Sequence, residues 1–157
     1  MRIGLISDTH NQLRPQVLDL FAGVDLILHA GDVGDLDIIV ELETMAPVHA
    51  VMGNTDSPEM RPRLRDTVEL ELEGHSVVVV HGHVLGSPNA PRLHAIYPDA
   101  DVIVYGHTHR QRLDEVDGCV IVNPGAAGAA RFNLKPCVAL LTLERDTPPL
   151  VEHIPIE

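Results

Sequence analysis

Asp101-Val-Ile-Val-Tyr-Gly-His-Thr-His109 joins a short apolar run to two imidazoles that stand one residue apart. The β-branched run predicts a strand buried on both faces, as in a parallel sheet. Gly106 follows it, and glycine permits a sharp turn and close approach of the backbone. His107 and His109 are therefore expected together at the carboxyl end of a buried strand. Alone, such a pair is either a metal site or two polar residues of a loop.

The amino-terminal third repeats a β-α-β arrangement. Short apolar runs at 2–8 and 24–30 predict buried strands, and the helical spacing of 15–22 predicts a helix between them. A second helix is expected over 35–45, with Leu36, Ile39 and Val40 on its buried face, followed by a strand over 48–52. Helical crossovers of this kind join parallel strands.

The rest of the chain is richer in strands. Residues 67–73 alternate strictly between apolar side chains and glutamates, which predicts a half-buried strand that turns at Gly74 into a second strand over 76–80. A short helix around 92–97 precedes the strand 101–105, and further strands are expected at 113–116, 119–122, 138–143 and 150–156. So many strands favour two packed sheets flanked by helices, within one domain that spans residues 1–157.

Composition narrows the class of protein. The formal net charge of −12 argues against nucleic acids and anionic membranes as partners, since both are bound through Lys and Arg. No apolar run approaches the roughly 20 residues of a membrane span, and the first residues enter a strand pattern directly. Cys119 and Cys137 form no CxxC pair, so a thiolate zinc site or disulfide framework is not expected. We expect a cytoplasmic protein.

Polar side chains of the metal-ligand type follow each of five apolar runs. In open α/β sheets the carboxyl ends of the strands meet at one edge, so these residues are expected to converge. They offer carboxylate, amide and imidazole groups: Asp8, His10, Asp32, Asn54, His81, His107 and His109. This set exceeds the coordination of one transition-metal ion and suits two. Two ions a few ångströms apart are the usual arrangement for hydrolysing phosphate esters, with a bridging water that becomes hydroxide near neutral pH.

In this order the motifs resemble those of the calcineurin-like metallophosphoesterases, and within them the small single-domain, YfcE-like phosphodiesterases. The family pattern of D-x-H, GD, GN, a histidine pair, GHTH and an NPG turn is matched by Asp8/His10, Gly31/Asp32, Gly53/Asn54, His81/His83, 106–109 and 123–125. The resemblance covers residues 1 to about 125.

The resemblance implies an α/β fold, a four-layer α-β-β-α sandwich of two mixed β-sheets flanked by helices. It also implies two divalent metal ions per chain, with Mn²⁺ expected first and Ni²⁺, Fe²⁺, Co²⁺ or Zn²⁺ left open, because nitrogen and oxygen ligands accept all of them. By the same resemblance one ion would be held by Asp8, His10, Asp32 and His109, and the other by Asp32, Asn54, His81 and His107. The bridging role of Asp32 is carried over from the family.

The chain departs from many family members at Thr55, where they carry a histidine that protonates the leaving oxygen. A hydroxyl cannot donate a proton near pH 7, and losing a general acid costs on the order of 10² to 10⁴ in rate. YfcE-like relatives also lack this histidine, so diesters and activated esters are favoured over plain monoesters. His83 is the candidate to bind phosphate, replace the acid or orient a ligand. Asp56 is the candidate to orient Asn54 or the attacking water, or else to cap its loop.

The sequence therefore predicts a dinuclear metal-dependent phosphodiesterase that acts on a small substrate by attack of a metal-bridging hydroxide. Two alternatives stay open. The first is a catalytically weak or inactive interaction scaffold, since the superfamily includes a retromer subunit of this fold that serves mainly as a binding surface. The second is a phosphomonoesterase. The physiological substrate, the native metal and any homo-oligomeric state are left open, and His29 is expected to be a buried residue that supports the ligands.

Overall fold

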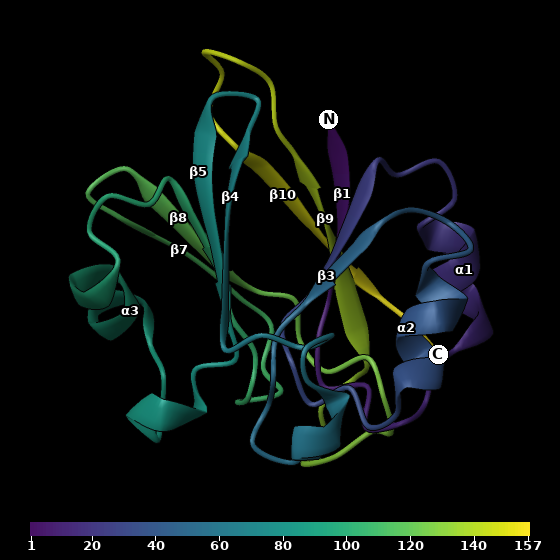
Figure 1. The fold of residues 1–157 in the computed structure, drawn as a ribbon. Helices are drawn as coiled ribbons and strands as arrows, with labels where there is room; N and C mark the ends of the chain where they lie inside the picture. Colours follow the sequence, from purple (N-terminus) through teal and green to yellow (C-terminus); the bar gives the residue numbers. More distant parts are fainter.

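Two five-stranded sheets form the centre of the molecule, with helices on the outside of each (Figure 1). The structure is a computed structural model that describes residues 1–157. In spatial order, the first sheet contains β10 (Leu150–Pro155), β9 (Cys137–Thr142), β1 (Arg2–Ile6), β2 (Leu26–His29) and β3 (Val48–Ala50). Strands β1, β2 and β3 are parallel, whereas β9 and β10 complete the sheet in antiparallel fashion. The sheet is therefore mixed.

The second sheet is also mixed. It contains, in spatial order, β4 (Thr67–Leu72), β5 (His75–Val80), β6 (Val102–Val104), β8 (Cys119–Asn123) and β7 (Arg112–Val116). Its three inner strands are parallel, and an antiparallel strand closes each edge. The helices are α1 (Pro15–Leu20), α2 (Leu36–Leu42) and α3 (Ala90–Ile96), and two short 3₁₀ segments are η1 (Pro58–Met60) and η2 (His83–Leu85).

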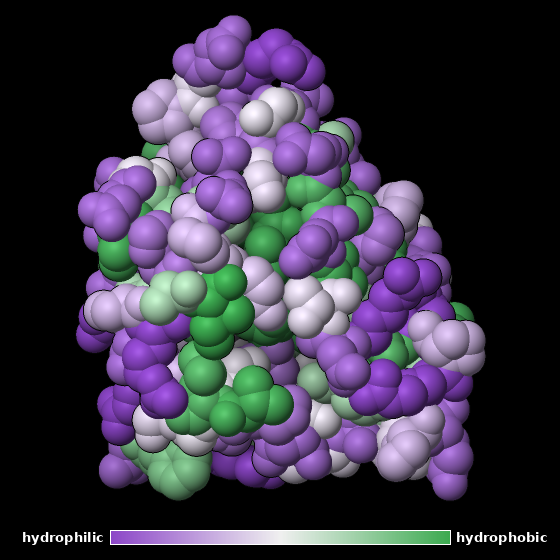
Figure 2. All heavy atoms as spheres, turned by 60° about the vertical axis from the view of Figure 1, so that its left-hand side comes forward, coloured by the Kyte–Doolittle hydropathy of each residue, from purple (hydrophilic) through white to green (hydrophobic).

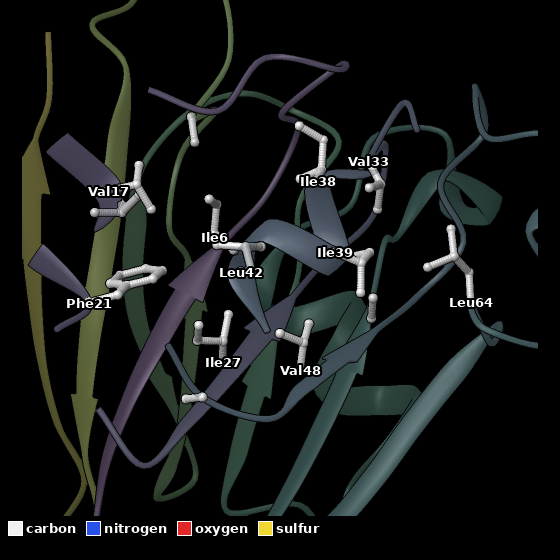
Figure 3. Packing of buried hydrophobic residues seen from close by; sticks show 14 of the residues in the cluster. Ile6, Val17, Phe21, Ile27, Val33, Ile38, Ile39, Leu42, Val48 and Leu64 are labelled. Atoms are coloured by element: carbon white, nitrogen blue, oxygen red, sulfur yellow. The ribbon is translucent and has the colours of Figure 1, made fainter. Parts of the chain in front are cut away.

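The molecule has four layers, helix, sheet, sheet and helix, and a hydrophobic cluster fills each of the three spaces between them. Ile3 and Leu5 of β1 pack with Val77 and Val79 of β5 between the two sheets. The opposite face of the first sheet packs against α1 and α2 (Figure 3), and α3 covers the outer face of the second sheet. The expected four-layer α-β-β-α sandwich is confirmed.

The predicted buried face of the second helix is wrong in one respect. Val40 is 61% exposed, whereas Ile38, Ile39 and Leu42 are the buried residues of α2. The side chain of Asp35 caps the amino terminus by accepting a hydrogen bond from the backbone of Asp37, and this cap sets where the helix begins. Ile38, Ile39 and Leu42 form the face that packs in the core, and Val40 lies on the opposite side of the helix, in solvent. The segments η1 and η2 were not expected, because neither is long enough to show a periodic pattern.

The carboxyl ends of β1, β2, β3, β5 and β6 open toward the same edge of the sandwich. In Figure 1 this edge is the cluster of loops at the bottom, opposite the amino terminus. The loops from the two sheets meet there, so residues far apart in the sequence become neighbours. None of the helices combines the length and the apolar character that crossing a membrane requires.

Candidate metal centre

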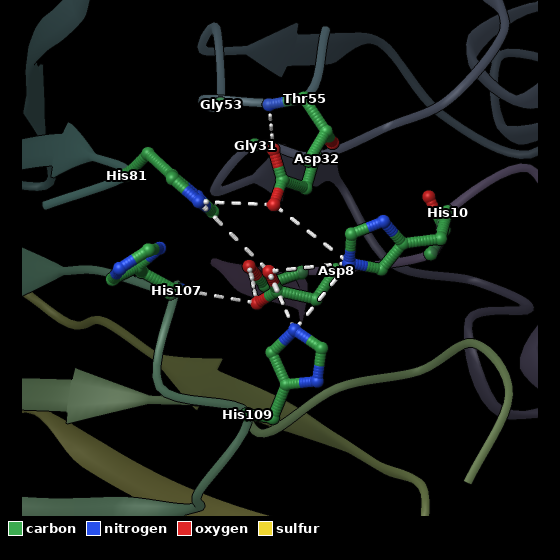
Figure 4. Close-up of polar contacts among 12 residues, drawn as sticks. Asp8, His10, Gly31, Asp32, Gly53, Thr55, His81, His107 and His109 are labelled. Carbon is green, nitrogen blue, oxygen red and sulfur yellow. Dashed lines mark hydrogen bonds and ion pairs between the residues drawn. The ribbon is translucent and has the colours of Figure 1, made fainter. Parts of the chain in front are cut away.

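The seven side chains predicted as metal ligands lie together where these loops meet. Figure 4 shows six of them, and the seventh, Asn54, is placed by its contacts with His81 and His107. The ligand atoms form two groups, and within each group they all lie within 4.8 Å of one another. One group is Asp8, His10 and His109, and the other is Asp8, Asp32 and His81. Asp8 belongs to both groups. The two groups are therefore adjacent, with Asp8 in common.

Asp8 is held by one oxygen and presents the other. Its Oδ2 accepts hydrogen bonds from the hydroxyl of Ser7 at 2.7 Å and from the backbone N–H of His107 at 3.2 Å. Its Oδ1 is buried, has no hydrogen-bond partner, and lies 3.4 Å from Nε2 of His109. A buried carboxylate oxygen without a donor is costly unless a cation accompanies it.

Asp32 is oriented in the same way. Its Oδ1 accepts the backbone N–H of Thr55 at 2.9 Å, while its Oδ2 lies 3.3 Å from Nε2 of His81 and 3.7 Å from Nε2 of His10. Burial acts to raise the pKa of Asp32, but the hydrogen bonds from His81 and Thr55 outweigh it and hold this pKa far below its usual range. Asp32 is therefore an anion, and one of its oxygens is within reach of a histidine from each group.

The histidines turn ring nitrogens toward these carboxylates. Nδ1 of His81 donates to the carbonyl of Ala30 at 2.7 Å, which leaves Nε2 facing the centre. Oδ1 of Asn54 lies 3.1 Å from that nitrogen and 3.2 Å from Nδ1 of His107. On the other side, the Nε2 atoms of His10 and His109 approach within 3.4 Å. Nitrogen and oxygen donors that converge in this way fit divalent transition-metal ions.

Five of the seven predicted ligands have a left-handed backbone, which L side chains rarely adopt. Their φ angles are 54° for Asp8, 44° for His10, 54° for Asp32, 72° for His107 and 63° for His109. Such strain persists only where the surroundings enforce it, and it concentrates at functional sites. Glycines make room for the close packing: a Cβ at Gly106 would overlap Oγ of Ser7 and lie 2.9 Å from Oδ2 of Asp8.

The two predicted catalytic residues have different surroundings. His83 begins η2 at the rim, with its ring 5.3 Å from that of His81 and 6.3 Å from that of His107. Its Nδ1 is buried without a partner, and burial, followed by the two neighbouring histidines, lowers its pKa. Asp56 lies behind the Asn54 loop, where its carboxylate accepts three backbone N–H groups, from Val33 at 3.2 Å, Gly34 at 3.0 Å and Gly53 at 2.9 Å.

His29 is fully buried beneath the centre, as expected. Its Nδ1 accepts the backbone N–H of Gly31 at 3.2 Å, and its Nε2 lies 3.0 Å from the hydroxyl of Thr9. The sequence reasoning missed Thr9 and Ser7, although both flank Asp8. It also missed Phe132, which is 73% exposed and lies edge-on to His109 with 6.0 Å between ring centroids. Nothing in its sequence neighbourhood indicates this position.

Comparison with known proteins agrees with this geometry. Residues 1–146 match the calcineurin-like phosphoesterase superfamily domain. The chain is 38% identical to a probable metallophosphoesterase of Methanothermobacter thermautotrophicus, over 92% of this chain and 87% of the relative. It is 30% identical to the phosphodiesterase YfcE of Escherichia coli, over 80% and 79% of the two chains.

A solved structure of wild-type Vps29 from Entamoeba histolytica in complex with zinc is similar over 99% of both chains, with a TM-score of 0.79 and 26% identity. The match therefore extends from sequence motifs to the whole sandwich. From the family match and the shared architecture, we conclude that this chain belongs to the calcineurin-like phosphoesterase superfamily.

Proposed function

We propose that this protein is a dinuclear metal-dependent phosphodiesterase that acts on a small substrate. One observation carries the proposal: two adjacent groups of ligand atoms share Asp8, and Oδ2 of Asp32 lies between the histidines of both groups. The unpartnered Oδ1 of Asp8 adds to a donor set that suits cations. When bound, two divalent ions would activate a water as the hydroxide nucleophile and neutralise charge on the phosphate.

In this proposal one ion is held by Asp8, His10, Asp32 and His109, and the other by Asp32, Asn54, His81 and His107. Mn²⁺ is the first candidate, as the family resemblance implies, and Ni²⁺, Fe²⁺, Co²⁺ and Zn²⁺ stay open because imidazole and oxygen ligands accept all of them. Oδ1 of Asp8 lies 3.9 Å from Nε2 of His81, so in this proposal Asp8 also lies next to a ligand of the second ion.

Other residues act on the substrate or on the ligands. His83 lies with its ring 5.3 Å from that of His81, and in this proposal it contacts a phosphate or ester oxygen. Asp56 is a positioning residue, because its carboxylate is committed to backbone N–H groups of two ligand loops. Thr55 contributes its backbone N–H to Asp32 and supplies no acid. Diesters and esters with good leaving groups are therefore the expected substrates.

Hydrolysis of bis-p-nitrophenyl phosphate by the Mn²⁺-loaded protein tests the proposal. We expect turnover that a chelator abolishes, and losses of at least 10²-fold in Asp32→Ala and His107→Ala variants. His75→Ala is the matched control, since His75 lies at the amino end of β5, away from the site, and this variant should keep wild-type activity. Full activity after either ligand substitution would refute the assignment.

The scaffold alternative draws on the likeness to Vps29. A protein that serves only as a scaffold has no need to retain the metal ions that the converging donors suit. Elemental analysis after loading with Mn²⁺ separates the two: fewer than one ion per chain would favour the scaffold. Comparing turnover of p-nitrophenyl phosphate with that of the bis ester on one preparation separates a phosphomonoesterase from a phosphodiesterase.

A further inference from the structure

An apolar cavity opens directly beside the metal centre. It has a volume of about 260 Å³ and lies between η2, α3 and the carboxyl end of β5. Its apolar lining comes from Val80, Val84, Leu85, Leu93, Ile96 and Tyr97. His81 and His83 also line it, and because His81 is one of the predicted metal ligands, the cavity borders the metal centre directly.

The mouth of this cavity leaves large apolar side chains in contact with water. Val84 is 83% exposed, more than any other large hydrophobic residue of the chain, and Ile96 is 49% exposed. Figure 2, in which the α3 side is turned forward, shows hydrophobic side chains gathered on the lower half of this face. A contiguous apolar surface beside a functional site is typical of a binding surface, because its exposure is otherwise unfavourable.

Hydrogen bonds hold the elements that form the cavity in place. The guanidinium of Arg92 donates to the carbonyls of Leu85 at 2.7 Å and Ser87 at 3.2 Å, tying α3 to the loop that follows η2. The side chain of Asn89 caps α3 by accepting the backbone N–H of Arg92 at 3.0 Å. A braced cavity is preformed, so little conformational entropy is lost when it is filled.

Charge limits what the cavity can accept. Asp66 is the only Asp, Glu, Lys or Arg in its lining, and this carboxylate is paired with Arg61 at 2.6 Å. No Lys or Arg lines the cavity, which disfavours a second phosphate or a nucleic-acid backbone there. The cavity on the other side of the centre differs: it adjoins His109 and includes Lys135, Gln111 and Asn133 in its lining. The two flanks of the centre thus differ in polarity.

We propose that the cavity between η2 and α3 binds one apolar, uncharged ester arm of a phosphodiester whose phosphate lies at the metal centre. This inference rests on the proposed function and names its class of substrate. A cavity of roughly 150 Å³ accommodates benzene, so about 260 Å³ takes a group the size of one aromatic ring. Continuity carries the argument, because His81 lines both the metal centre and the cavity, and His83 lines the cavity beside the ring of His81.

Binding of two unreactive diesters tests the proposal without turnover. Diphenyl phosphate and dimethyl phosphate carry the same charge and differ in their arms. Calorimetric titration of the Mn²⁺-loaded protein should show at least tenfold tighter binding of diphenyl phosphate, about 1.4 kcal/mol. Val84→Asp and Ile96→Asp should reduce this preference to less than threefold. The controls Val40→Asp and Leu113→Asp, at apolar positions of comparable exposure outside the cavity lining, should keep it.

Equal affinity for the two diesters, or a preference that survives both cavity substitutions, would overturn the subsite. The outcome is independent of catalysis. A preference for diphenyl phosphate without any hydrolysis of bis-p-nitrophenyl phosphate would leave the subsite standing and refute the phosphodiesterase. Hydrolysis without the preference would do the reverse.

Discussion

His29 should make the protein sensitive to acid before its carboxylates are titrated. The ring is fully buried, and both nitrogens are used: Nδ1 accepts the N–H of Gly31, so Nε2–H is left to donate to the hydroxyl of Thr9. That hydroxyl in turn donates to the carbonyl of Val33 at 2.7 Å. Only the neutral ring satisfies this chain of hydrogen bonds. Burial lowers the pKa of His29 from 6.5 to about 4.

The size of the effect follows from this shift. Each pKa unit corresponds to about 1.4 kcal/mol, so protonation of His29 opposes folding by up to about 3 kcal/mol. The pKa is lower in the folded state, so the unfolded chain binds more protons as the pH falls below 6.5. The contribution to stability is therefore complete above pH 6.5 and is lost as the pH falls toward 4. Between pH 7.5 and 4.5 the loss should be about 2–3 kcal/mol.

Urea denaturation at pH 7.5 and 4.5, with a chelator present, measures this loss. The chelator is needed because metal affinity also depends on pH. A His29→Gln variant should be less stable at pH 7.5, yet its free energy of unfolding should fall with pH by about 2–3 kcal/mol less than that of the wild type. His94→Gln, at a partly exposed histidine of α3, should reproduce the wild-type slope. Equal slopes for wild type and His29→Gln would refute the reasoning.

Three further substitutions test how the site and core are built. Gly53→Ala should weaken Mn²⁺ binding by at least tenfold in chelator competition, because its Cβ would overlap the backbone and carboxylate of Asp32. Asp56→Asn should lower the free energy of unfolding, measured by urea denaturation, by about 2 kcal/mol and should weaken Mn²⁺ binding, because a carboxamide cannot accept all three N–H groups. Gly4→Ala should lower the free energy of unfolding by about 1–3 kcal/mol and leave metal binding intact, since its Cβ would lie 2.9 Å from the ring of Phe21. Adding Phe21→Leu to the Gly4→Ala chain should restore part of this stability in the same assay.

Much of the fold follows from local pattern. The alternation over 67–73 places Val68 inside and Glu69 outside, as found in β4, and the apolar runs mark the buried inner strands. The order of the strands does not follow from such patterns. Strand β9 pairs with β1 although the two lie at opposite ends of the chain. Pairing over that separation depends on how the whole core packs, and one sequence carries no local signal for it.

The chemistry of the site was predictable for a similar reason. Parallel strands of one sheet end at a common edge, so the polar residues that follow them are brought to the same region of the fold. The orientation of each ligand was not predictable. Asp8 presents Oδ1 because the backbone N–H of His107 and the hydroxyl of Ser7 occupy Oδ2. Such choices depend on loop conformations with positive φ, which hydrophobic periodicity does not encode.

Asp56 shows how far the site depends on residues that neither bind a metal ion nor contact the substrate. From the sequence it could be an orienting residue or the cap of its own turn, and one of its three bonds, to Gly53, is of that local kind. The other two reach Val33 and Gly34, directly after Asp32 in the preceding ligand loop. One carboxylate therefore fixes the distance between the Asp32 loop and the Asn54 loop. A chain could retain every predicted ligand and still lose the centre if this connection were broken, because the donors converge only while the two loops are held together.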